Sequence, residues 1–319
     1  MRECPIADLL DKRLAFVTGK GGVGKTTVAY ALGLAAAAAG KRAIVCEIAA
    51  QERGSRIFGR SPIGFHETRV SQGLWAISID PERTIREYLE VQMPMRSMAA
   101  ILARSNLFGY LTAATPGLQE MVSMGKVWEL TLNERKSPDA ERTYDIVIVD
   151  APATGHGIAF LQTPHEFRDL ARVGPLAHQA GRIERTLADP TATGVAIVAR
   201  GEEMAVNEAI ALERRLAGPD AGTRFEIDRF YVNCLYPDRL SGPERKLIER
   251  VVKRSANESA QAAEPALRAA LEEATRAAAQ REQLERLREQ VAGPVAELPF
   301  LFAPGLGPEQ LSRLAGVLT

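Results

Sequence analysis

The chain has 319 residues, of which 46% are apolar and 25% are charged. These proportions are ordinary for a globular protein built as one large domain or two small ones. The 40 basic and 40 acidic residues cancel. This balance argues against a nucleic-acid binder, because such proteins carry a basic excess or a basic patch.

The cysteines and the hydropathy pattern indicate the cellular environment in which the protein works. Cys4, Cys46 and Cys234 lie far apart in the sequence, so they predict no disulfide framework and favour a reducing, cytoplasmic environment. No apolar stretch reaches the roughly 18 residues of a membrane span, and we expect no signal peptide. Any membrane contact would therefore be peripheral.

The first predicted element is an apolar strand at residues 14–17, followed by a glycine-rich loop and a helical pattern over residues 27–39. The loop has the G-x-x-x-x-G-K-S/T spacing of a phosphate-binding loop. Its residues are Gly19, Lys20, Gly21, Gly22, Val23, Gly24, Lys25, Thr26 and Thr27. Glycines let successive N–H groups turn toward one point, where the helix dipole also has its positive end. The stretch predicts a site for the phosphates of ATP or ADP; the alternative is an ordinary glycine-rich turn.

Three side chains of the loop suit this chemistry. Lys25 would reach the β- and γ-phosphates, and the hydroxyl of Thr26 would coordinate Mg²⁺. A second lysine, Lys20, has no role in an ordinary phosphate-binding loop. It would complete a site across a dimer interface by neutralising charge on the partner's nucleotide, unless it is simply a solvated loop charge.

The rest of the chain alternates between short apolar strands and helical patterns. Strands are expected at residues 42–48, 74–79, 144–149, 193–199, 225–233 and 295–298. Helices are expected at residues 204–216 and 308–318, in an insertion at about 82–132, and in a charged segment at about 243–291 that breaks near residue 264. This alternation predicts an α/β fold with a doubly wound, mostly parallel sheet and a helical insertion, in a single domain over residues 1–319.

An acidic residue, Asp150, ends the strongly apolar strand at residues 144–149. Nucleotide-binding folds place the carboxylate that holds Mg²⁺ at the carboxyl end of such a strand. Gly155 follows and would let the next segment respond to the γ-phosphate, as switch loops do. The alternative for Asp150 is a helix N-cap.

Two of these motifs resemble a known family. The loop sequence G-K-G-G-x-G-K-T-T resembles the deviant Walker A loop of an NTPase class whose members work as nucleotide-sandwich dimers. Residues 150–156, Asp-Ala-Pro-Ala-Thr-Gly-His, resemble the switch II motif of the arsenite-pump/Get-type ATPases within that class. The resemblance extends over about residues 12–240 and 294–318.

Further segments support the resemblance. Residues 77–81 and 115–120 are similar to family motifs at the start of the helical subdomain and within it. Residues 231–235 resemble a strand whose Asn binds adenine in the family, which implies that Asn233 recognises the base. A turn residue at a strand end is the alternative for Asn233.

The resemblance implies a Mg²⁺-dependent ATPase that works as a dimeric switch. ATP would close the dimer through Lys20 and the γ-phosphate, and hydrolysis would let it open. The partner would be a second copy of the chain or a paralogous subunit. A hydrophobic client protein would respond to the movement of the helical insertion.

The chain departs from the family in switch I, where an Asp-Pro just after the second strand usually positions the attacking water. Ala49 and Ala50 occupy that place here, and the nearest carboxylates are Glu47 and Glu52. Either Glu47 takes the role from a shifted position, or the subunit hydrolyses ATP poorly and a partner in a heterodimer supplies the missing group.

Other departures concern metals and clients. The dispersed cysteines form no metalloid cluster, which argues against arsenite transport, and no C-x-x-C zinc site exists. The insertion is short for a groove that holds a transmembrane segment. Methionines at positions 93–124 would line such a groove or pack as core residues, and core packing is favoured.

Two rival classes stay open. A Min/Par-type positioning ATPase predicts a basic amphipathic tail, but the last ten residues contain a single basic residue, Arg313. A non-hydrolysing, nucleotide-gated scaffold is the second rival, and Ala49 favours it.

Overall fold

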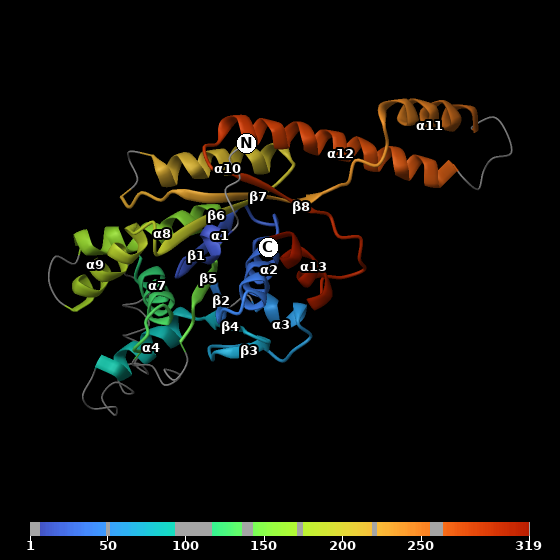
Figure 1. Cartoon of the computed structure of the whole chain (residues 1–319). Helices are drawn as coiled ribbons and strands as arrows, with labels where there is room; N and C mark the ends of the chain where they lie inside the picture. Colours follow the sequence, from blue (N-terminus) through green and yellow to red (C-terminus); the bar gives the residue numbers. More distant parts are fainter. Residues whose placement is uncertain are drawn as a thin grey trace.

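A computed structural model describes most of the chain. The described residues are 7–48, 52–92, 117–135, 143–170, 175–218, 222–255 and 264–318. Their strands form one sheet in the order β3-β4-β2-β5-β1-β6-β7-β8 (Figure 1). The strands are β1 (Leu14–Gly19), β2 (Ala43–Ile48), β3 (Thr68–Ser71), β4 (Leu74–Ile79), β5 (Ile146–Asp150), β6 (Thr193–Arg200), β7 (Ile227–Leu235) and β8 (Val295–Pro299).

Neighbouring strands pair in parallel except for β3, which runs antiparallel to β4. The predicted doubly wound, mostly parallel sheet is confirmed. Each strand predicted from the sequence is present, with ends shifted by a few residues. The antiparallel strand β3 was not predicted, because only Val70 of its four residues is buried, and so short a segment shows no apolar run.

Helices cover both faces of the sheet. One face carries α2 (Lys25–Ala38) and α13 (Pro308–Leu318), which lie side by side in Figure 1. The other face carries α7 (Leu118–Leu130), α8 (Thr154–Leu170), α9 (Pro175–Ala188) and α10 (Glu203–Ala217). Further helices are α1 (Ala7–Leu10), α3 (Arg53–Ile57) and α4 (Pro81–Gln92).

The alternation of side chains along β1 explains the two layers. Leu14 and Phe16 belong to the apolar core beneath α7–α10, whereas Ala15 and Val17 belong to the core beneath α2 and α13. Successive residues of a strand point to opposite faces. A strand that is buried on both faces is therefore apolar throughout. β1 lies in the interior of the sheet, between β5 and β6.

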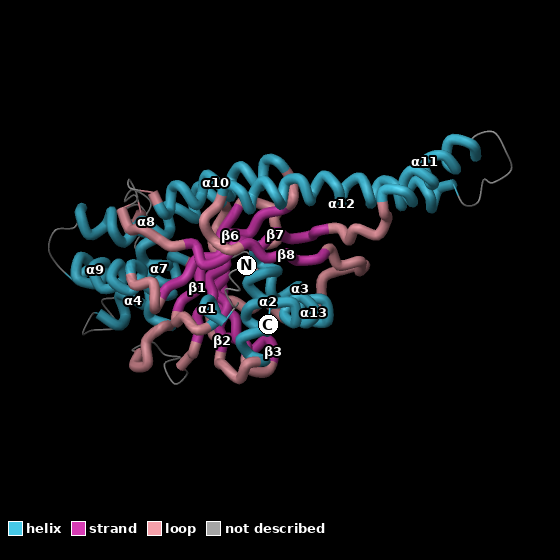
Figure 2. The backbone as a smooth tube through the Cα atoms, turned by 45° about the horizontal axis from the view of Figure 1, so that its top comes forward, coloured by secondary structure: helices cyan, strands magenta, loops and turns pink. Residues whose placement is uncertain are grey.

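The charged segment near the carboxyl end consists of α11 (Gly242–Ser255) and α12 (Glu264–Gln290). The two helices pack against each other and project beyond the edge of the sheet (Figure 2). The inner part of α12 contacts α10 and β7, and Leu284 and Leu287 are buried there. The predicted boundaries of this segment and of the helical insertion stay predictions about domain organisation.

The methionines of the predicted insertion are only partly within the described residues. Met121 and Met124 are buried in α7 and belong to the core against the sheet, which agrees with the packing alternative. Met93, Met95 and Met98 lie outside the described ranges. Among the helices in these ranges, none combines the length and the apolar character that crossing a bilayer requires.

Candidate functional site

The glycine-rich loop joins the end of β1 to the start of α2, at the carboxyl edge of the sheet. Gly24 has φ 96°, and a Cβ at this position would lie 2.3 Å from the amide nitrogen of Asn233. A Cβ at Gly19, where φ is 142°, would lie 2.2 Å from the carbonyl oxygen of Val198 in β6. Only glycine fits at these two positions, so the loop has the tight path that the sequence predicted.

Lys25 begins α2 and is buried at the mouth of the loop. Its ammonium donates a hydrogen bond to the carbonyl oxygen of Lys20 at 3.1 Å. Burial lowers the pKa of Lys25, and the nearby Asp150 carboxylate opposes this shift. The ammonium therefore reaches back to the loop that would bind a phosphate.

Thr26 and Asp150 come together although 124 positions separate them in the sequence. The hydroxyl of Thr26 donates to Oδ2 of Asp150 at 2.5 Å, because β5 pairs with β1 in a register that sets Asp150 beside Val17. Burial raises the pKa of Asp150 to about 6, and the charge of Glu47 adds to that rise while the Thr26 hydrogen bond opposes it.

This pair fits the Mg²⁺ that the sequence predicted. A hydroxyl and a carboxylate are the hard oxygen ligands that Mg²⁺ takes together with substrate phosphates and water. The described residues contain no group of three or more His, Cys, Asp or Glu side chains that would hold a metal alone. Thr26 and Asp150 would therefore hold the ion jointly with the nucleotide.

Glu47 lies next to Asp150 across the β2–β5 pair, and its buried carboxylate accepts three hydrogen bonds. The donors are the hydroxyl of Tyr30 at 2.6 Å, the backbone N–H of Arg53 at 2.7 Å and that of Gly54 at 2.6 Å. The carboxylate thus fixes the start of α3 to the end of β2. Its predicted part in positioning water stays a prediction.

The other switch I candidates are less informative. Glu52 accepts a hydrogen bond from the N–H of Gly64 at 3.0 Å, so its carboxylate is also engaged. Ala49 and Ala50 lie outside the described residues. In switch II, α8 begins at Thr154 and Gly155 lies in its first turn, and the side chains of Thr154 and His156 are not described.

Asn233 lies near the end of β7 and is buried against the loop. Its amide nitrogen donates to the carbonyl oxygen of Val23 at 3.0 Å, and its amide oxygen accepts from the N–H of Cys234 at 2.9 Å. The side chain therefore braces the phosphate-binding loop in this structure. Its implied contact with adenine stays a prediction, and the brace is a role that the sequence did not reveal.

Lys20 points toward α10, where its ammonium lies 3.1 Å from Oε1 of Glu208. The two side chains are 30% and 37% exposed. Glu208 was not predicted, because no local pattern marks an acid on α10 as a neighbour of a loop that precedes it by 188 positions.

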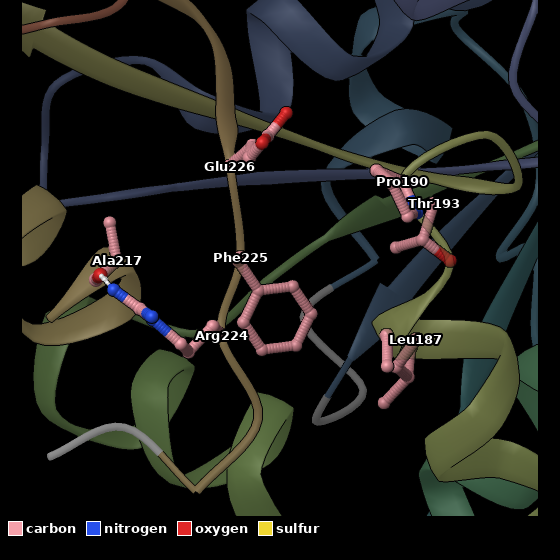
Figure 3. Close-up of a pocket in the computed structure, with 8 residues that line it drawn as sticks. Leu187, Pro190, Thr193, Ala217, Arg224, Phe225 and Glu226 are labelled. Carbon is pink, nitrogen blue, oxygen red and sulfur yellow. Dashed lines mark hydrogen bonds between the residues drawn. The ribbon is translucent and has the colours of Figure 1, made fainter. Parts of the chain in front are cut away.

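A pocket of about 480 Å³ lies at the other end of the sheet, where β6 begins. Figure 3 shows the residues that line it: Leu187, Ala188, Pro190, Thr193, Ala217, Arg224, Phe225 and Glu226. In the β1–β6 register, Thr193 pairs with Leu14 and Val198 with Gly19. The pocket is therefore separated from the glycine-rich loop by the length of β6.

The fold and the loop define a P-loop nucleotide-binding protein: a parallel sheet with the loop at its carboxyl edge, Lys25 and Thr26 at the start of α2, and Asp150 on the neighbouring strand. The model of the family "Anion-transporting ATPase" matches residues 12–175. The chain belongs to this family, as the resemblance to the arsenite-pump/Get-type ATPases implied.

Individual relatives agree with this assignment. The chain is 30% identical to ATPase BagA of Mycobacterium tuberculosis over 212 residues, which are 64% of this chain and 61% of that protein. It is 31% identical to ATPase GET3 of Phaeosphaeria nodorum over 183 residues, covering 56% of this chain and 53% of that protein. The chain thus spans about half to three fifths of these relatives' own length.

Proposed function

We propose that this protein is a Mg²⁺-dependent ATPase that acts as a dimeric switch in the cytoplasm. Its membership of an ATPase family supports the activity. The observation that carries the proposal is the contact of Thr26 with Asp150 beside the glycine-rich loop. It joins a metal-binding pair to a phosphate-binding loop, which is the arrangement that ATP with Mg²⁺ requires.

The residues of the site would divide the work. The N–H groups of the loop and the ammonium of Lys25 would bind the β- and γ-phosphates. Thr26 and Asp150 would hold Mg²⁺, and that ion supplies positive charge against the charge of the phosphates. In this scheme Lys25 moves its hydrogen bond from the carbonyl of Lys20 to a phosphate oxygen.

Lys20 would act across the dimer. Released from Glu208, its ammonium would neutralise charge on the nucleotide of the second subunit and so favour the closed dimer. Hydrolysis or release of the nucleotide would remove that charge and let the dimer open. The resulting movement of the helical subdomains would change a surface for a hydrophobic client or a partner protein.

Two measurements on the full chain test this function. We expect Mg²⁺-dependent ATP hydrolysis, and we expect sedimentation velocity to show a dimer with ATP and a smaller species with ADP. Lys25→Ala should lose nucleotide binding, and Lys20→Ala should still bind ATP but no longer associate. A wild-type chain that binds neither nucleotide would refute the proposal.

The hydrogen bonding of the Glu47 carboxylate favours a second candidate function. Three hydrogen bonds hold its carboxylate, so a weakly hydrolysing subunit of a heterodimer is the alternative. Single-turnover hydrolysis, with and without a paralogous subunit, separates the two. A rate that rises on adding the paralogue supports the heterodimer, and an equal rate supports the self-sufficient enzyme.

A further inference from the structure

Arg53 is anchored at the site by its backbone. It is the first residue of α3, and its N–H donates to Oε2 of Glu47 at 2.7 Å. Glu47 stands in register with Asp150 across the β2–β5 pair. The main chain of Arg53 is therefore held at the carboxyl edge of the sheet, next to the strand end that carries the Thr26–Asp150 pair.

The start of α3 is held in place by several contacts. The N–H of Gly54 donates to Oε1 of Glu47, and a Cβ at Gly54 would lie 1.9 Å from the hydroxyl oxygen of Tyr30. Glu52 adopts φ 42°, a conformation that non-glycine residues rarely take. These contacts fix the position from which the side chain of Arg53 extends.

The guanidinium of Arg53 is exposed and forms no ion pair with any residue in the described ranges. The backbone of Arg53 is held at the end of β2, where Glu47 stands in register with Asp150 at the end of β5. An exposed cation with a fixed backbone thus extends from this edge of the sheet, next to the strand end that carries Asp150.

Glu52, the residue before α3, has its carboxylate held by the N–H of Gly64. Arg53, the first residue of α3, is the first cation that follows β2 and is exposed to a ligand. A guanidinium has donors in a planar fork, which suits the oxygens of a phosphate. A terminal phosphate above Lys25 and Thr26 is the anion that the site would present to it.

We propose that Arg53 binds the terminal phosphate of ATP held in its own subunit, as a second cation beside Lys25. This inference rests on the proposed function and deepens it, because it assigns the recognition of ATP over ADP to a residue outside the glycine-rich loop. Glu47 becomes a positioning residue, because its carboxylate holds the backbone from which Arg53 extends.

The test compares nucleotide binding by calorimetry on the full chain with Mg²⁺. The ligands are ADP and the slowly hydrolysed analogue ATPγS, and the variants are Arg53→Ala, Arg53→Lys and the control Arg56→Ala. Arg56 is an exposed cation on the same short helix. A charged hydrogen bond predicts that Arg53→Ala weakens ATPγS binding about 10- to 100-fold, and ADP binding less than about twofold.

The remaining outcomes are also decisive. Arg53→Lys should fall between wild type and Arg53→Ala, and Arg56→Ala should match wild type for both ligands. The inference fails if Arg53→Ala leaves the ratio of the two affinities unchanged or if Arg56→Ala alters it equally. A wild-type chain that binds ATPγS and ADP equally well overturns the inference alone, whereas one that binds neither overturns the proposed function as well.

Glu47→Gln provides a second test, because an amide cannot accept all the hydrogen bonds of the carboxylate. It should reduce the preference for ATPγS in the wild-type background and leave it unchanged in the Arg53→Ala background. If Glu47 has a merely structural role, Glu47→Gln would weaken the binding of ATPγS and of ADP equally in both backgrounds. That outcome would refute the part of Glu47 in positioning Arg53.

Discussion

The ammonium of Lys20 lies 3.1 Å from the carboxylate oxygen Oε1 of Glu208. The lysine that we propose to act on the nucleotide of a second subunit is thus paired within its own chain. The pair is partly exposed, and such ion pairs stabilise by only about 0.2–1 kcal/mol. Lys20 can therefore exchange the carboxylate of Glu208 for the phosphate of a nucleotide at a small cost in free energy.

Glu208→Gln should make ATP-dependent association easier. Removing the competing carboxylate frees Lys20, and an ion pair of this strength predicts an association constant that rises by at most about fivefold. Sedimentation at a series of ATP concentrations measures the change. The control is Glu203→Gln, an exposed acid on the same helix. Weaker association of Glu208→Gln would mean that Glu208 itself contacts the second subunit.

Asn233→Ala should destabilise the protein and weaken binding of every nucleotide. The substitution removes the donor to the carbonyl of Val23, and a buried group left without its partner costs about 1–3 kcal/mol. Urea unfolding measures the loss of stability, and calorimetry with ATP and GTP measures selectivity. Unchanged stability together with a lost preference for ATP would instead assign Asn233 to the base alone.

The secondary structure around the candidate site was predictable from the sequence. The strand–loop–helix context predicted Lys25 and Thr26 as phosphate- and Mg²⁺-binding candidates, and both lie at the start of α2. The terminal helix was expected at residues 308–318, where α13 lies. Asp150 was expected as a metal ligand because it ends an apolar strand. Each of these inferences depends on neighbouring residues, since period and turn chemistry are local properties.

The partners of these residues were not predictable. The contact of Asn233 with Val23 joins positions that are 210 residues apart, and the approach of Arg53 to Asp150 depends on the pairing of β2 with β5. Strand order is a property of the folded sheet, and a single sequence does not state it. The role of Glu47 at the start of α3 was missed for a different reason, because no sequence motif marks a carboxylate that accepts hydrogen bonds from N–H groups six and seven residues ahead.

Gly54→Ala should destabilise the protein, because the new methyl group would meet the hydroxyl oxygen of Tyr30 at 1.9 Å and Oε1 of Glu47 at 2.8 Å. Overpacking of this kind costs about 1–3 kcal/mol. The matched control is Gly181→Ala in α9, where a Cβ meets nothing within 4 Å. Alanine there should stabilise the helix by up to about 1 kcal/mol. Urea unfolding measures the stability of both variants. Equal changes in stability would show that Gly54 is not closely packed.

Asp150→Asn should stabilise the protein above pH 6 in the absence of nucleotide and Mg²⁺, while it abolishes Mg²⁺-dependent ATP binding. The folded-state pKa of Asp150 is raised to about 6 from 3.8, chiefly by burial, so the folded state holds this proton more tightly than the unfolded state. The contribution of Asp150 to stability is therefore complete below about pH 4 and is lost as the pH rises through 6, by at most about 3 kcal/mol. The difference in free energy of unfolding between the variant and the wild type isolates the contribution of Asp150 from those of the other groups that titrate. Urea unfolding should show a stability difference near zero at pH 4 that grows to its full size by pH 7. A stability difference that does not change over this range would contradict the burial of the charge.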